Sequence, residues 1–203
     1  MISSSIIRDV QGICATGSAL LAYYYFDFRD IGKQDRHGLL SSLLLQLCTQ
    51  SRRGYEFLSS LHATHDDGQK LPSDSDLIQW LKDVLTFPGQ QTVYVIVDAL
   101  DECPNSVGLP TPREEVLELL KELVDLKLPH LRVCVTSRPE IDIEYALEPF
   151  MSHQMSLHDE SGQKGDIRDY IRSVVHSDRM MRRWREEDKN LVINTLSERA
   201  DGM

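Results

Sequence analysis

Apolar residues along this chain fall into two patterns, which predict two kinds of secondary structure. Three short runs are apolar, aromatic or β-branched almost throughout, at 19–28, 93–98 and 131–136. Runs of this kind are typical of strands that are buried on both faces of a parallel sheet. Elsewhere the apolar residues recur every three or four positions, which predicts amphipathic helices. The first of these helices is expected to begin near Ser4. The others are expected to cover 38–49, 77–85, 113–127, 166–176 and 187–200.

The order of these segments predicts the fold class. Strands and helices alternate up to about residue 158, as in an α/β three-layer sandwich built on a parallel sheet. A short run at 154–157 predicts one more strand at the end of this part. After Asp159 the pattern is purely helical. We therefore expect an α/β core over residues 1–158 and the start of a helical subdomain over 159–203.

Three carboxylates follow the most apolar of the predicted strands. That strand ends in Asp98, and Asp101 and Glu102 come within the next four positions. Open α/β sheets bind their ligands at the carboxyl ends of the strands, and an Asp there can hold Mg²⁺ beside a nucleotide phosphate. The alternative interpretation is a core strand followed by an acidic turn without a ligand. Asp98 is therefore a candidate magnesium and cofactor ligand.

A second motif, Thr136-Ser137-Arg138-Pro139, ends the next predicted strand. The planar guanidinium of Arg138 could pair with two oxygens of a phosphate. It could equally neutralise the carboxylates of the acidic turn with no ligand involved. The motif alone does not decide between these two hypotheses.

Composition and charge narrow the class of partner. The net charge is −10, whereas a nucleic-acid-binding surface normally shows a basic patch. The arginines at 179–185 are followed at once by three acidic residues, which favours a solvated helix face. The four cysteines have no C-x-x-C spacing, so we expect reduced thiols in a cytoplasmic protein. No stretch reaches the roughly eighteen apolar residues that would span a membrane. We expect neither nucleic acid nor membrane as a partner.

The glycine-rich loop that wraps nucleotide phosphates is not found in the printed sequence. That loop has the pattern G-x-x-x-x-G-K-[ST], whose backbone amides and lysine contact the phosphates. Residues 12–18 have its glycine spacing, but no lysine precedes Ser18 and no strand comes before Gly12. We interpret this match as accidental.

Four segments taken together resemble a known domain family. They read YYYFDF at 23–28, LLSSLL at 39–44, VIVDALDEC at 95–103 and VTSRP at 135–139. In this order they are similar to the NACHT-type NTPase domain of large fungal NOD-like receptors, which is also described as the nephrocystin-3-like N-terminal domain. The segments 156–171 and 200–203 are similar to the start of the helical subdomain in the same family.

The resemblance implies a nucleotide-dependent signalling switch that uses Mg²⁺ and ATP or GTP. In such a switch Asp98 would hold Mg²⁺, and the carboxylates of Asp101 and Glu102 would position the attacking water. Ser137 and Arg138 would then contact the γ-phosphate.

The resemblance also implies a sheet of strand order 5-1-4-3-2, of which the first strand and its phosphate loop are missing here. We therefore expect a P-loop NTPase-like sandwich clipped at both ends, which by itself binds no nucleotide tightly and performs no hydrolysis. The alternative hypothesis is a non-catalytic module that binds other protein chains. An unpaired edge at 131–136 would favour such binding, including self-association.

Overall fold

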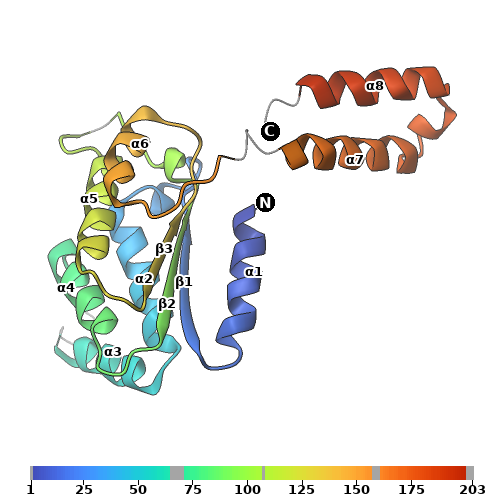
Figure 1. Ribbon diagram of the computed structural model, residues 1–203. Coiled ribbons are helices and arrows are strands. Elements are labelled where there is room, and N and C mark those ends of the chain that lie inside the picture. Colours follow the sequence, from blue (N-terminus) through green and yellow to red (C-terminus); the bar gives the residue numbers. More distant parts are fainter. Residues whose placement is uncertain (1, 65–70, 107, 157–160, 200–203) are drawn as a thin grey trace. The chain divides into compact units, whose positions relative to one another are not determined.

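The computed structural model of this protein describes residues 2–64, 71–106, 108–156 and 161–199 (Figure 1). The chain forms two compact units, residues 1–150 and residues 151–203. The first unit contains a three-stranded sheet and the helices that cover it, and the described part of the second contains two α-helices. Within the described ranges no helix is both long and apolar enough to cross a membrane.

All three strands of the first unit run parallel, with β2 (Thr92–Asp98) between β1 (Ala19–Tyr25) and β3 (Leu131–Val135). The register pairs Tyr25 with Asp98 and Val97 with Val135, so the strands end at the same level. The side chains of Val93, Val95 and Val97 are completely buried in the central strand. This sheet confirms the predicted α/β class.

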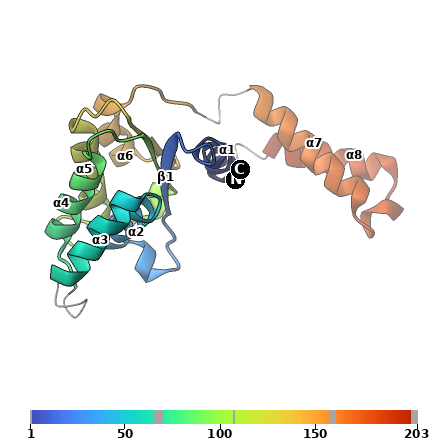
Figure 2. The ribbon, with the colours of Figure 1, turned by 90° about the horizontal axis from the view of Figure 1, so that it is seen from below.

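Helices cover both faces of the sheet, which gives the predicted three layers. Helix α1 (Ile2–Cys14) lies on one face, where Ile7 and Val10 pack against Leu21 and Ile96. The other face carries a larger leucine-rich core, and its helices lie on the side of β1 away from α1 (Figure 2). Its helices are α2 (Arg36–Thr49), α3 (Arg52–Thr64), α4 (Asp74–Leu85) and α5 (Pro112–Asp125).

Short helical segments complete the first unit. A 3₁₀ turn, η1 (Ile31–Lys33), precedes α2, and another, η3 (Leu100–Glu102), follows β2. After β3 the chain forms α6 (Ile141–Leu147) and then η4 (Glu148–Phe150). The helical pattern at 113–127 was long enough to be predicted, whereas the seven residues of α6 are too few to show a periodicity.

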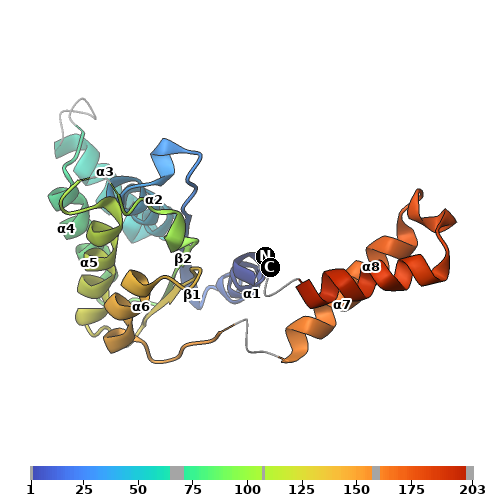
Figure 3. The same cartoon turned by 90° about the horizontal axis from the view of Figure 1, so that it is seen from above.

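The second unit is a pair of helices. Helix α7 (Ser161–Ser177) is joined to α8 (Glu186–Arg199) through the short turn η5 (Met181–Arg183), as Figure 3 shows. Val175 and Ile193 are buried where the two helices pack together. Both helices were predicted, with ends within a few residues of those observed, except that α7 begins five residues earlier.

The strand predicted at 154–157 is wrong over the part that the structure describes. Residues 154–156 form no strand, and their side chains are exposed. Leu157 lies outside the described residues. An isolated short run cannot form a strand without a neighbour, since the strand's hydrogen bonds come from its partners. The predicted end of β1 also differs, because the strand stops at Tyr25 rather than at residue 28.

Two glutamines, Gln46 in α2 and Gln50 directly after it, occupy the outer edge of β1. The amide of Gln46 accepts from the backbone N–H of Tyr23 at 3.1 Å and donates to its carbonyl at 2.8 Å. The amide of Gln50 does the same to Leu21, at 3.0 and 2.6 Å. These side chains satisfy backbone groups that an edge strand would otherwise leave unpaired. The outer edge of β3 has no neighbouring strand among the described residues.

Gly54, in the first turns of α3, gives the fold's first testable prediction. A Cβ added there would lie 2.6 Å from the Cα and the carbonyl oxygen of Cys48 in α2, and backbone cannot move aside easily. Gly54→Ala should therefore lower the free energy of unfolding by about 1–3 kcal/mol, measured by urea denaturation.

Gly12, in α1, provides the matched control. A Cβ there would meet no atom within 4 Å, so Gly12→Ala should raise stability by about 0.5–1 kcal/mol through helix propensity alone. Equal effects of the two substitutions would contradict the close packing of α2 against α3.

Candidate functional site

The carboxylate of Asp98 lies where three elements meet. Its Oδ2 accepts a hydrogen bond of 2.9 Å from the hydroxyl of Ser3 in α1, and its Oδ1 accepts one from the hydroxyl of Thr136, just after β3. Ser3 is only 3% exposed. The parallel register brings the ends of β2 and β3 to one level, which explains why Thr136 reaches Asp98. A single carboxylate thus connects α1, β2 and β3.

The chain turns sharply after Asp98. Ala99 adopts the left-handed conformation, with φ of 55°, and leads into η3. The backbone N–H of Ala99 donates to the hydroxyl of Thr136 at 3.2 Å, and that of Leu100 donates to the Thr136 carbonyl at 3.0 Å. An alanine in this conformation is uncommon and persists only where surrounding contacts hold it. The hydrogen bonds to Thr136 supply part of that restraint.

Asp101 contacts Arg138 directly. Oδ1 of Asp101 accepts from the backbone N–H of Arg138 at 3.0 Å, and its Oδ2 lies 3.5 Å from Nε of the same residue. The side chain of Asp101 is 10% exposed, whereas that of Arg138 is 81% exposed. The neutralising contact considered from the sequence is therefore present. It leaves most of the guanidinium open to solvent.

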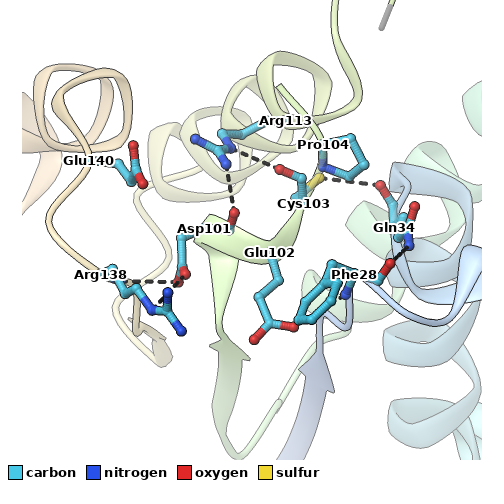
Figure 4. A pocket seen from close by; sticks show the side chains of 9 residues that line it. All are labelled: Phe28, Gln34, Asp101, Glu102, Cys103, Pro104, Arg113, Arg138 and Glu140. Carbon is cyan, nitrogen blue, oxygen red and sulfur yellow. Dashed lines mark hydrogen bonds and ion pairs between the residues drawn. The ribbon is translucent and has the colours of Figure 1, made fainter. Parts of the chain in front are cut away.

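Glu102 and Ser137 occupy other parts of the same region. One oxygen of the Glu102 carboxylate accepts from the backbone N–H of Phe28 at 3.2 Å, so this side chain points toward the segment after β1. Figure 4 shows it on the side of the turn away from Glu140. Ser137 is exposed, and its hydroxyl donates to the carbonyl of Arg138. The predicted residues gather at the carboxyl edge of the sheet, on two neighbouring strand ends.

A pocket of about 390 Å³ opens at this edge. Its walls come from the segment after β1, the acidic turn after β2, the start of α5 and the segment after β3 (Figure 4). Asp98 and Ser137 are not among its lining residues. The residues that line it are Phe28, Gln34, Asp101, Glu102, Cys103, Pro104, Arg113, Arg138 and Glu140.

Sequence reasoning missed three residues of this region. Ser3 lies beside the predicted start of a helix and Thr136 within its motif, and neither was given a role, although the hydroxyls of both donate to the Asp98 carboxylate. Arg113 was assigned to a helix without a role, yet its guanidinium lies against the acidic turn. Nothing in the spacing of Arg113 indicates this, because the sequence between Cys103 and Arg113 shows no periodic pattern.

The oxygen ligands here fit Mg²⁺ only together with a phosphate. No group of three or more His, Cys, Asp or Glu side chains within the described ranges could enclose a metal. Mg²⁺ commonly takes one or two carboxylates and completes its shell with water and phosphate oxygens. The Asp98 carboxylate is an oxygen ligand of the type that holds Mg²⁺ beside a nucleotide, and the Ser3 hydroxyl orients it. Such a carboxylate suits a magnesium–phosphate complex better than a free ion.

A family model described as "Nephrocystin 3, N-terminal" matches residues 1–138 of this chain. The match begins ahead of Ser3 and ends at Arg138. It therefore includes the acidic turn and the segment after β3 as far as Arg138. No curated protein and no solved structure matches the chain.

Cys103 gives a prediction about the chemistry of the pocket. Burial raises the pKa of its thiol to about 12, and the thiol donates to the Gln34 carbonyl at 3.3 Å. At pH 8 only about one molecule in ten thousand would carry a thiolate, so Cys103 should resist alkylation in the folded protein. We expect iodoacetamide labelling, followed by peptide mass spectrometry, to modify the partly exposed Cys14 first.

Unfolding in urea serves as the control, since all four cysteines should then react at similar rates. Rapid modification of Cys103 under native conditions would show that the thiol is accessible and ionised. It would then have to be considered as a nucleophile.

Proposed function

This chain belongs to the nephrocystin 3 N-terminal family, and we propose that its α/β unit is the nucleotide-responsive core of a signalling switch of the NACHT type. The observation that carries the proposal is the position of Asp98. It ends the central strand of a parallel sheet and accepts a hydroxyl hydrogen bond from α1. Arg138, on the adjacent strand end, leaves its guanidinium largely exposed at the same edge.

In this proposal each side chain at the carboxyl edge has one task. Asp98 binds Mg²⁺ directly or through water, and the Ser3 hydroxyl orients the Asp98 carboxylate. Arg138 pairs with oxygens of the terminal phosphate, and the exposed hydroxyl of Ser137 lies beside it. Asp101 and Glu102 are the candidates for positioning water. When bound, Mg²⁺ would neutralise charge on the phosphate oxygens.

The nucleotide is ATP or GTP, and the response is a change of conformation when a diphosphate replaces a triphosphate. Arg138 is the residue that would distinguish the triphosphate from the diphosphate, because only the triphosphate has the terminal phosphate that its guanidinium would contact. Residues 1–203 contain no G-x-x-x-x-G-K-[ST] segment, which in P-loop proteins supplies most contacts to the phosphates. By themselves these residues should therefore bind weakly and not hydrolyse the nucleotide.

A second candidate function is that of a non-catalytic module for binding protein chains. The open outer edge of β3 favours it, since an unpaired strand edge is a template for another strand. The two candidate functions differ in whether they need Asp98. A nucleotide switch requires its carboxylate, whereas a strand-binding module does not. The experiment below separates them through that residue.

The nucleotide proposal predicts binding that depends on Asp98 and on a phosphate loop. Fluorescent ATP and GTP should bind residues 1–203, in the presence of Mg²⁺, no more tightly than about 1 mM, or roughly −4 kcal/mol. A fusion that places a strand and a G-x-x-x-x-G-K-[ST] loop before Ile2 should bind at roughly 1–10 μM. Asp98→Ala in the fusion should weaken that binding by at least about tenfold, or about 1.4 kcal/mol.

Two results would contradict this account. Micromolar, Asp98-dependent binding by residues 1–203 alone would show that no phosphate loop is required. A folded fusion that binds neither nucleotide would reject the switch and favour the protein-binding module. Glu56→Ala, in α3 and away from the carboxyl edge, serves as the control for non-specific loss of a negative charge.

A further inference from the structure

Arg113 lines the pocket, but it is not available to a ligand. It is the second residue of α5, and its side chain is only 8% exposed. Each of its three guanidinium nitrogens already has an acceptor within the protein. Nε donates to the Cys103 carbonyl at 2.9 Å, Nη2 to the Asp101 carbonyl at 2.6 Å, and Nη1 to the Asp142 carboxylate at 3.1 Å. An arginine used in this way holds protein parts together.

Two of these acceptors belong to the acidic turn after β2. A 3₁₀ segment as short as η3 leaves carbonyls at its carboxyl end without partners inside the segment. The Arg113 fork supplies charge-assisted hydrogen bonds to two of them, those of Asp101 and Cys103. Since Ala99 enters the turn in the left-handed conformation, the turn needs such restraint from outside.

The third acceptor, Asp142, lies in the first turn of α6, directly after the segment that carries Arg138. Its carboxylate also accepts from the side-chain amide of Asn105 at 2.9 Å, and Asn105 in turn accepts from the hydroxyl of Thr111 at 3.1 Å. Arg113 is therefore bound at once to the acidic turn and to α6. Arg138 lies on the chain between the end of β3 and α6, so one guanidinium fixes α6, which follows Arg138, and the acidic turn, which contacts it.

Asp101 transmits this restraint to Arg138. Its main-chain carbonyl is held by Arg113, while its carboxylate accepts from the Arg138 backbone and lies near the Arg138 guanidinium. Figure 4 shows the two arginines on opposite sides of Asp101. A side chain that is 81% exposed, as Arg138 is, has little else to limit its orientation. Displacement of the Asp101 main chain would therefore release Arg138.

We propose that Arg113 is a positioning residue. Its hydrogen bonds hold the acidic turn against α6, so that Asp101 orients Arg138 toward the pocket. We call these hydrogen bonds of Arg113 to Asp101, Cys103 and Asp142 the bracket. The proposal deepens the proposed function and rests on it for the statement that Arg138 meets a phosphate. The bracket itself is a property of the protein without ligand. The two can therefore be tested separately.

The first measurement is amide proton exchange of residues 1–203 by ¹⁵N NMR, without ligand. Arg113→Lys keeps the charge but loses the fork, so it should accelerate exchange of the Arg138 amide by about tenfold. Exchange of buried β2 amides such as that of Val95 should change by less than about twofold. Arg132→Lys is the matched control, because Arg132 also donates to two backbone carbonyls, those of Pro129 and Leu131, but near the start of β3.

The second measurement tests the link to phosphate. Inorganic triphosphate with Mg²⁺ should shift the Arg138 Nε–Hε resonance in the unsubstituted chain and in Arg132→Lys, and shift it far less in Arg113→Lys. If the resonance of the unsubstituted chain does not move, the proposed phosphate contact fails while the exchange data still decide the bracket. A purely stabilising role for Arg113 would lower the urea midpoint without this selective loss at Arg138.

Two outcomes would overturn the proposal. In one, Arg113→Lys remains folded and leaves exchange of the Arg138 amide unchanged. In the other, exchange accelerates equally at Arg138 and at Val95, which would make Arg113 a general stabiliser. If Arg113→Lys does not fold, Asp142→Ala provides the test, because it removes the carboxylate that links Arg113 and Asn105 to α6 and leaves the bonds of Arg113 to the acidic turn. It should accelerate exchange at Arg138 in the same direction by a smaller factor, and no change in a folded Asp142→Ala protein would equally overturn the bracket.

Discussion

The hydrogen bonds to the Asp98 carboxylate are the constraint on which the functional edge of this protein depends. A carboxylate at the end of a buried central strand must be satisfied by donors, since an unpaired charge in such a place is costly. The donors are hydroxyls from α1 on one side and from the end of β3 on the other. The same contacts that satisfy the charge therefore set the positions of a helix and of a neighbouring strand end. Any ligand that competes for Asp98 acts on both.

The two outer edges of the sheet differ in a way that bears on partners. The edge of β1 is closed by the side-chain amides of Gln46 and Gln50, which mimic the hydrogen bonds of a further strand. The edge of β3 has no such cover in the residues that the structure describes. Since β3 leads directly into the segment of Arg138, a strand paired there would lie beside the proposed phosphate site. Partner binding and ligand binding could then influence each other through β3.

How much the sequence predicts depends on whether a residue's role follows from a periodic pattern. Asp98, Asp101 and Arg138 could be placed together in advance, because parallel strands end at the same edge and each residue follows a recognisable run. The buried contacts of Arg113 could not, because the sequence between Cys103 and α5 has no periodic pattern that would place the start of α5 against the acidic turn. The partners of Asp98 were hidden for a similar reason, since a serine in a helix gives no sign of the strand it faces. The strand predicted at 154–157, which is wrong over the described residues 154–156, shows the converse, that a short run without a neighbouring strand does not form a strand.

The central claim is that the carboxyl edge at Asp98 and Arg138 is a magnesium–phosphate site, and paramagnetic line broadening by Mn²⁺ tests it most directly. Residues 1–203 would be titrated with Mn²⁺ alone and with Mn²⁺ together with inorganic triphosphate, with Asp98→Asn as the control. The account predicts broadening centred on Ser3, Asp98 and Thr136 only when both components are present, and its loss in Asp98→Asn. Broadening that is confined to the exposed glutamates of α5, Glu118 and Glu122, or that is unchanged by Asp98→Asn, would contradict it.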